Sequence, residues 1–179
     1  IPTVVYGFFA LELLTRLVLV KIFPGIEVFN ALSAGLIMGI MIIPTIASLS
    51  EDAMAAVPSG LRDGAYALGS TKRQTAMKVV IPAALSGIVA AFVLGISRAI
   101  GETMIVTVAA GLQPQLSLNP LVGMQTMTSY IAAAGAGDLA TGSNEYKSIF
   151  AVGFLLYILT FIMNIFSVRL VRRFRQAYQ

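Results

Sequence analysis

The chain has 179 residues, of which 58% are hydrophobic and only 11% are charged, with a formal net charge of +4. Soluble domains carry about 25% charged residues, so this composition favours a membrane protein. The sequence contains neither cysteine nor histidine, which excludes disulfides, thiol nucleophiles, imidazole bases and the usual zinc sites.

The first element is an apolar run over residues 1–14, which is shorter than the ~20 residues that a bilayer-spanning helix needs. Arg16 and Lys21 follow this run. We interpret the run as the outer half of a span whose first half would precede Ile1. The alternative is an interfacial helix with Glu12 and Arg16 at the water line.

Three later segments are long and nearly free of charge. Residues 28–50 and 148–168 contain no charged side chain, and residues 83–111 contain only Arg98 and Glu102. Each segment reaches the length of a membrane span, and together they favour membrane helices over a large soluble helical core. The sequence therefore predicts an all-α fold, a polytopic membrane helix bundle that forms a single transmembrane domain over the whole chain.

The polar segment 51–82, which lies between the expected spans 28–50 and 83–111, predicts two short helices. Pro58 ends whatever helix precedes it, and Ser59 is expected to cap the next one. Gly69 suits the left-handed residue just past the end of a helix.

The second short helix has a start signal of its own. Thr71, with Gln74 three residues later, forms a capping box. Pro82 is expected in the first turn of the span 83–111, where its missing N–H costs little. Two helices joined by a glycine turn also occur in DNA-binding proteins. Spans on both sides favour instead a docking element for a cytoplasmic protein, with no nucleic acid partner.

The span 83–111 carries two opposite charges, Arg98 and Glu102, at a spacing of i, i+4. On a continuous helix this spacing places both side chains on one face, and charges at membrane depth mark functional pathways. A guanidinium fork matches an oxyanion, and Glu102 would neutralise Arg98 when no substrate is bound. The alternative is a structural ion pair that clamps two helices. Thr103 and Thr107 lie nearby and either line a polar path or bond to their own backbone.

Basic residues gather in two places, which orients the spans. Eight of the twelve basic residues lie in the segment 51–82 or near the C-terminus: Arg62, Lys72, Arg73, Lys78, Arg169, Arg172, Arg173 and Arg175. Cytoplasmic segments are enriched in Lys and Arg. We therefore expect residues 51–82 and the C-terminus to be cytoplasmic, and residues 112–147, where Lys147 is the only basic residue, to lie outside.

The cytoplasmic segment resembles the EAA loop of ABC importer permeases. The matching residues are Asp63-Gly64-Ala65, three further residues, Gly69, nine further residues and Val79-x-Ile81-Pro82. Asp stands for the family's Glu, and Gly64 stands for its first Ala. The resemblance implies a loop of coupling helices that docks on an ATPase subunit. The coupling residues would be Arg62, Asp63, Gly64, Ala65, Gly69 and Pro82.

The following span resembles permeases for the oxyanions phosphate, molybdate and sulfate. The motif is Arg98-Ala99-x-Gly101-Glu102, and its continuation Thr103-Met104-x-Val106-Thr107 is similar to the C-type subunit of phosphate permeases. Residues 1–7 and 124–131 also resemble phosphate permeases. The resemblance implies six spans in the full protein, of which this chain would hold three and part of a fourth. The substrate path would include Arg98, Glu102, Thr103 and Thr107.

The resemblance also implies partners. They are a second permease subunit of the A type, a cytoplasmic ATPase dimer that binds ATP and Mg²⁺, and an extracytoplasmic phosphate-binding protein, in the cell inner membrane. The chain has no G-x-x-x-x-G-K-S/T motif, so we expect it to be a transporter subunit without cofactor or enzymatic activity of its own. One alternative is a permease for molybdate or sulfate. Another is a stand-alone channel or secondary transporter, which would contain inverted repeats or broken helices that the sequence pattern does not indicate.

Overall fold

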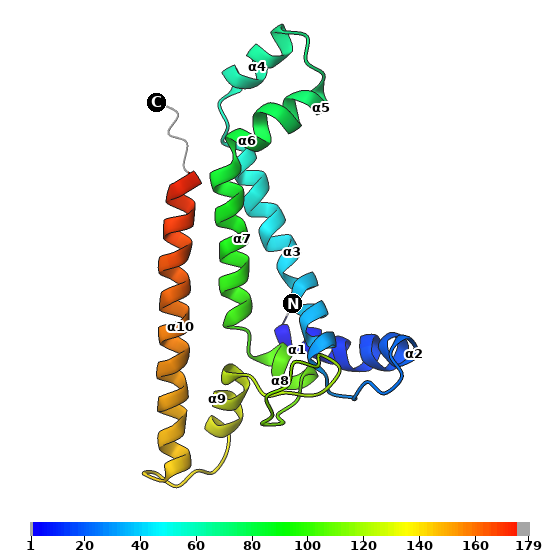
Figure 1. The fold of residues 1–179 in the computed structure, drawn as a ribbon, viewed down its shortest axis with the longest axis vertical. Helices are drawn as coiled ribbons and strands as arrows, with labels where there is room; N and C mark the ends of the chain where they lie inside the picture. Colours follow the sequence, from blue (N-terminus) through cyan, green and yellow to red (C-terminus); the bar gives the residue numbers. More distant parts are fainter. Residues whose placement is uncertain (1, 175–179) are drawn as a thin grey trace. The chain divides into compact units, whose positions relative to one another are not determined.

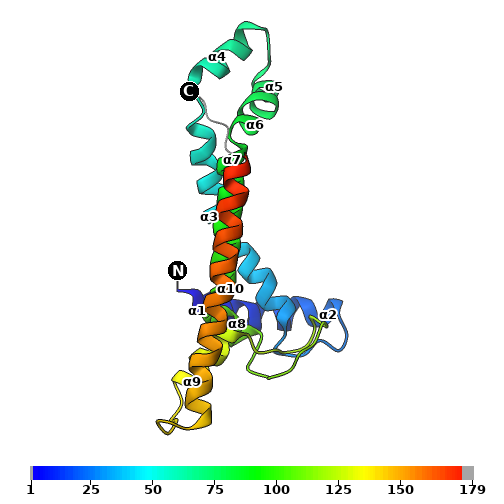
Figure 2. The ribbon, with the colours of Figure 1, turned by 60° about the vertical axis from the view of Figure 1, so that its left-hand side comes forward.

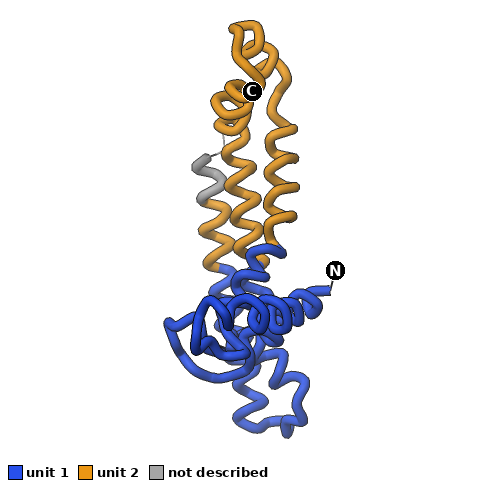
Figure 3. The backbone as a smooth tube through the Cα atoms, turned by 90° about the vertical axis from the view of Figure 1, so that its right-hand side faces the viewer, with its two compact units in different colours: residues 1–41, 99–161 blue, residues 42–98, 162–179 orange. Residues whose placement is uncertain are grey.

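The computed structural model describes residues 2–174, and the side chains of residues 2–169. Every regular element in this part of the chain is a helix, which confirms the all-α prediction (Figure 1). The chain divides into two compact units, residues 1–41 with 99–161 and residues 42–98 with 162–179 (Figure 3). The predictions that concern Ile1 and the basic side chains of Arg172, Arg173 and Arg175 fall outside the described residues.

The N-terminal segment forms one continuous helix, Thr3–Ile22, of 20 residues. It consists of α1 (Thr3–Phe9), the π-helical η1 (Ala10–Leu19) and α2 (Val20–Ile22). The expectation that the N-terminal apolar run is too short to span a membrane is wrong, because the helix continues past Glu12 and Arg16 and reaches 20 residues. Arg16 pairs with Glu12 at 3.0 Å, one turn apart on the same helix, and such a pair supports a helix rather than stopping it.

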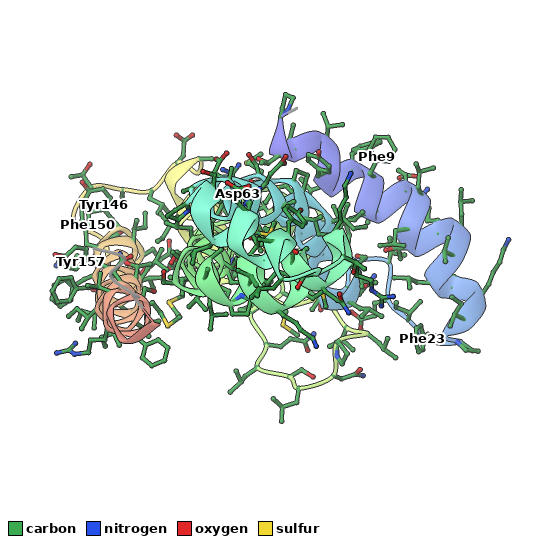
Figure 4. The ribbon with its side chains drawn as sticks, turned by 90° about the horizontal axis from the view of Figure 1, so that it is seen from above. Phe9, Phe23, Asp63, Tyr146, Phe150 and Tyr157 are labelled. Atoms are coloured by element: carbon green, nitrogen blue, oxygen red, sulfur yellow. The ribbon has the colours of Figure 1, made fainter. Side chains whose placement is uncertain are left out.

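Two of the expected spans are confirmed and are longer than the sequence predicts. Helix α3 covers Ala31–Ala55 and helix α10 covers Asn144–Phe174. Both contain a stretch that is long and apolar enough to cross a membrane. Aromatic side chains mark α10, including the edge-to-face pair Tyr146–Phe150, whose ring centroids lie 5.2 Å apart (Figure 4).

The expected span 83–111 is wrong as a continuous helix. Helix α7 covers only Leu85–Ile100, the backbone then leaves the helical path at Gly101, and a short helix α8 covers Met104–Ala109. Sixteen residues extend about 24 Å, less than the ~30 Å hydrocarbon layer. A broken helix therefore does occur in this chain, and its presence does not separate a stand-alone transporter from a permease subunit.

The polar segment 51–82 contains the two expected helical parts. The first is α4 (Ser59–Ala67). The second is the continuous helix Lys72–Ala83, made of α5 (Lys72–Thr75), the π-helical η2 (Ala76–Val80) and α6 (Ile81–Ala83). In both views, α4 and α5 stand at the end where α3 finishes and α7 begins (Figures 1 and 2).

The turn signals of this segment are mostly confirmed. Gly69 has a φ of 81°, and Thr71 and Gln74 form the capping box. Ser59 does not cap α4, because Pro58 occupies the N-cap position and Ser59 is already helical.

Pro82 is not in the first turn of the next span. It lies near the end of the Lys72–Ala83 helix, which meets α7 at an angle of 68°. Proline removes a helical hydrogen bond, and the π-helical turns of η2 directly before it are a typical site of helix distortion. The bend therefore has a local cause in the sequence.

Helices α3 and α7 pack closely through small residues in the second unit. A Cβ atom on Gly87 would collide with the Cβ of Ala53, and one on Gly95 would lie 2.7 Å from Ile46 Cδ1. Val57, Val80 and Ala84 form a buried cluster at the end of these helices. Small residues thus allow the two backbones to approach, as is usual in membrane bundles.

We predict that Gly87→Ala destabilises the protein by about 1–3 kcal/mol, because the added methyl group overlaps the fixed methyl group of Ala53. The matched control is Gly39→Ala in α3, where nothing lies within 4 Å of the added carbon. That change should be neutral or stabilising by up to about 1 kcal/mol, since alanine favours helices. Thermal unfolding of the purified protein measures both, and equal shifts for the two variants would contradict the close contact.

Candidate functional site

Glu102 lies in the break between α7 and α8 and caps the second of these helices. Its Oε1 accepts hydrogen bonds from the backbone N–H groups of Met104, at 3.2 Å, and Ile105, at 3.3 Å. The first N–H groups of a helix have no partner within the helix, and a carboxylate there also interacts favourably with the helix dipole. The charge of Glu102 therefore has a defined structural partner.

The expectation that Arg98 and Glu102 share one helix face is wrong. Helix α7 ends at Ile100, so the i, i+4 spacing does not describe a continuous helix. Arg98 is exposed and lies in the last turn of α7, where a cation is favourable because the C-terminal end of a helix is partly negative. A role for either residue in substrate passage stays a prediction.

The two threonines of the expected path bond to backbone. Thr107 Oγ1 donates to the carbonyl of Thr103 at 2.7 Å, and Thr103 Oγ1 donates to the carbonyl of Gly101 at 3.4 Å. Both hydroxyl groups therefore bond to backbone, and a place for either threonine on the substrate path stays a prediction. The carbonyl of Thr103 also accepts the helical bond from the N–H of Thr107 at 3.0 Å, so the hydroxyl of Thr107 is a second donor to it.

A contact that the sequence did not suggest joins the break to α9 (Met127–Gly135). The buried Thr128 donates from Oγ1 to the backbone carbonyl of Glu102 at 2.8 Å. The two residues are 26 positions apart, and no local pattern links them. The capping box of Thr126 and Ser129 at the start of α9 was the signal for a helix there, although not for this contact.

Helix α8 is held in place by apolar packing. Ile105 and Ala109 are fully buried, and Val106, Ala109 and Ala110 cluster with Ala10 of the N-terminal helix and Ala34 of α3. Gly7 has no side chain and so lets α8 pack closely against the N-terminal helix, since a Cβ at this position would lie 2.9 Å from Val108 Cβ. The Glu102 cap therefore belongs to a helix with a fixed position in its unit.

Asn30 forms a buried polar node that the sequence interpretation missed. Its side-chain amide donates to Thr15 Oγ1 at 3.2 Å, its Oδ1 accepts from the N–H of Ser33 at 2.7 Å, and its own N–H donates to the carbonyl of Ala109 at 3.0 Å. These bonds tie the N-terminal helix, the start of α3 and the end of α8 together. Asn30 lies inside the predicted span 28–50, directly before the observed start of α3 at Ala31, and asparagine is a helix N-cap signal that could have revealed its bond to Ser33.

The coupling residues fall into two groups by exposure. Asp63 and Gly64 are exposed on α4 (Figure 4 labels Asp63), whereas Ala65 is buried. Arg62 Nη2 donates to the carbonyl of Met54 at 2.8 Å, so the guanidinium group ties α4 to the last turn of α3. Asp63 and Gly64 are thus free for contact with another protein, while Arg62 serves the internal structure of the loop.

Comparison with known proteins identifies the family of the chain. The family model described as "Binding-protein-dependent transport system inner membrane component" matches residues 1–176. The chain belongs to this family. It is accordingly a helical membrane protein, and the resemblance to phosphate-transport permeases is confirmed by its relatives.

Three relatives illustrate the match. A probable ABC transporter permease protein, YqgH of Bacillus subtilis, is 38% identical over 90% of this chain and 52% of its own length. The phosphate transport system permease protein PstC of Xylella fastidiosa is 37% identical over 77% of this chain and 42% of its own. PstC of Haemophilus influenzae is 32% identical over 99% of this chain and 61% of its own.

The chain therefore spans about half the length of the curated relatives that it matches. No solved structure matches it.

We predict that Thr128→Val weakens the joint at the helix break. The change keeps the shape of the side chain but leaves the part-buried carbonyl of Glu102 without its donor, at a cost of about 1–3 kcal/mol. Thr160→Val is the matched control, since in the part of the chain that the structure describes Thr160 bonds only to carbonyls of its own helix, those of Leu156 and Tyr157. The apparent unfolding temperature should fall for the first variant and change little for the second; the opposite order would exclude a structural role for the contact.

Proposed function

We propose that this chain is a transmembrane permease subunit of an ATP-driven importer for inorganic phosphate. The observation that carries this function is the match of 77–99% of the chain to permeases named for phosphate transport. The subunit forms the translocation path with a second permease, receives phosphate from an extracytoplasmic binding protein and is driven by a separate cytoplasmic ATPase dimer that binds ATP and Mg²⁺. Family membership disfavours a stand-alone channel or secondary transporter, and molybdate or sulfate remains the alternative cargo.

In the proposed path, Arg98 binds the oxyanion. Its guanidinium group offers a planar fork of donors that matches two oxygens of phosphate. Glu102 supplies a competing carboxylate that limits the strength of binding and so permits release. Its position in a helix break supports this role, because irregular backbone at membrane depth occurs where it is enclosed by protein or lines a water-filled cavity.

In the proposed coupling, the loop of α4–α6 docks on the ATPase from the cytoplasmic side. Exposure of Asp63 and Gly64 on α4 and the sharp turn at Gly69 support this docking surface. Residues 51–82 and the C-terminus then face the cytoplasm, and residues 112–147 face the exterior, as the distribution of basic residues favours.

The substrate path is tested by Arg98→Gln and Arg98→Lys, with phosphate uptake as the measurement. Loss of a charged hydrogen-bond donor costs about 1.5–3 kcal/mol, which corresponds to roughly a 10- to 150-fold loss of uptake for Arg98→Gln. Arg98→Lys keeps the charge without the fork and should lose less. Arg16→Gln is the control, because within the described residues Arg16 pairs only with its neighbour Glu12 on the N-terminal helix.

The abundance of the subunit must be equal in all four proteins. Normal phosphate uptake by Arg98→Gln at normal abundance would exclude Arg98 from the path. Competition of uptake by molybdate or sulfate more strongly than by unlabelled phosphate would instead support the alternative cargo.

Coupling is tested by Gly69→Val. A β-branched residue at a φ of 81° costs on the order of 1–2 kcal/mol and distorts the turn between the coupling helices. We expect phosphate uptake to fall while the complex still assembles, with ATP hydrolysis no longer stimulated by substrate. The control is Gly60→Val in α4, which has open space and no positive φ. Full transport with normal stimulation in Gly69→Val would argue against docking through this loop.

A further inference from the structure

The loop between α8 and α9 is fixed to the entry of α3. The N–H of Leu32 donates to the carbonyl of Pro120 at 2.8 Å, and the N–H of Ala31 donates to the carbonyl of Val122 at 3.2 Å. Glu27 adds a side-chain bond, since its Oε2 accepts from the N–H of Gly123 at 2.8 Å. The base of the loop therefore has the same depth as the first turn of α3.

The tip of this loop presents leucine side chains that nothing in the described structure covers. Leu116 is 105% exposed and Leu118 is 102% exposed, relative to an isolated residue, and Leu112 is partly exposed at 45%. The sequence has no charged residue from 103 to 137. Fully exposed large apolar side chains on a charge-free loop are unusual in water and indicate a surface that covers them.

The position of the loop identifies that surface. Helix α3 has 25 residues, or roughly 37 Å of length, a few ångströms more than the ~30 Å hydrocarbon layer, so its first turn lies near the hydrocarbon boundary. Leu118 is two residues from Pro120 and so lies within about 7 Å of it along an extended chain, and Pro120 is hydrogen-bonded to Leu32 in that turn. The headgroup region on each side is roughly 5–8 Å thick, which places Leu118 within reach of lipid.

We propose that the loop 112–120 is an interfacial anchor whose Leu116 and Leu118 side chains enter the boundary between lipid headgroups and acyl chains. The loop can enter this region cheaply because it carries no charge that must leave water. The fixed base of the loop holds the leucines at one depth. The carboxylate of Glu27 lies at this base, bonded to Gly123, and not at the tip. The anchor stabilises the orientation of the unit that carries the Glu102 cap, and it does not depend on which oxyanion is transported.

The chain has no native cysteine, so a single spin label can test the anchor. Leu118→Cys carries a nitroxide in the full chain, purified with its complex and reconstituted in phosphatidylcholine–phosphatidylglycerol vesicles. Collision rates with oxygen, which partitions into lipid, and with a water-soluble nickel chelate give the depth of the label. Unsubstituted protein supplies the background from cysteines of other subunits.

Two positions calibrate the scale. Phe154→Cys, on the exposed apolar surface of α10, gives the value for lipid, and Thr141→Cys, in the exposed loop next to Asp138, gives the value for water. We expect the oxygen-to-nickel ratio at Leu118 to be several-fold higher than at Thr141 and closer to that at Phe154. Leu116→Cys should agree, and it replaces Leu118→Cys if that variant fails to assemble.

Two results would overturn the anchor. A ratio equal to that of Thr141 at both leucine positions means that the loop is in water. Low collision rates with both reagents mean that the leucines are covered by another protein chain, such as a binding protein.

Discussion

The arrangement at the start of α8 depends on one requirement, that the backbone groups released by the break after Ile100 must find partners. A polar group that is buried without a partner costs free energy, on the order of 1–3 kcal/mol. Glu102 meets part of this requirement with its own carboxylate, which accepts the N–H groups of Met104 and Ile105. Thr128 meets another part by donating to the carbonyl of Glu102. A charge in the middle of an apolar segment is thus explained first by backbone chemistry.

This cap is effective only if α8 cannot move away from it, and the packing of the same unit ensures that. Buried Ile105 and Ala109 fix one side of α8, and the carbonyl of Ala109, near its C-terminal end, accepts from Asn30. Asn30 in turn bonds to Thr15 of the N-terminal helix. Three segments distant in the sequence therefore hold a six-residue helix that would have no stability by itself.

What the sequence could predict was set by local chemistry. The spans around α3 and α10 follow from charge-free length, and the turn at Gly69 and the cap at Thr71 follow from residues within a few positions of each other. The segment 83–111 misled because its composition suits a span, whereas α7 ends at Ile100 and Glu102 caps a separate helix, α8. Thr128 and Asn30 could not be placed, since their partners are 26 and 79 positions away and only the folded chain brings them together.

The coupling loop shows how a docking force could enter the membrane helices. Arg62 binds the carbonyl of Met54 in the last turn of α3, and Gly87 of α7 lies against Ala53 in the same turn. A displacement of α4 must therefore act on α3 and α7 together rather than on a flexible linker. Helix α3 continues without interruption to Ala31, whereas α7 ends at Ile100 before the Glu102 cap. We therefore expect a displacement of α4 to reach α3 and α7 at this shared turn, where Ala53 and Gly87 meet.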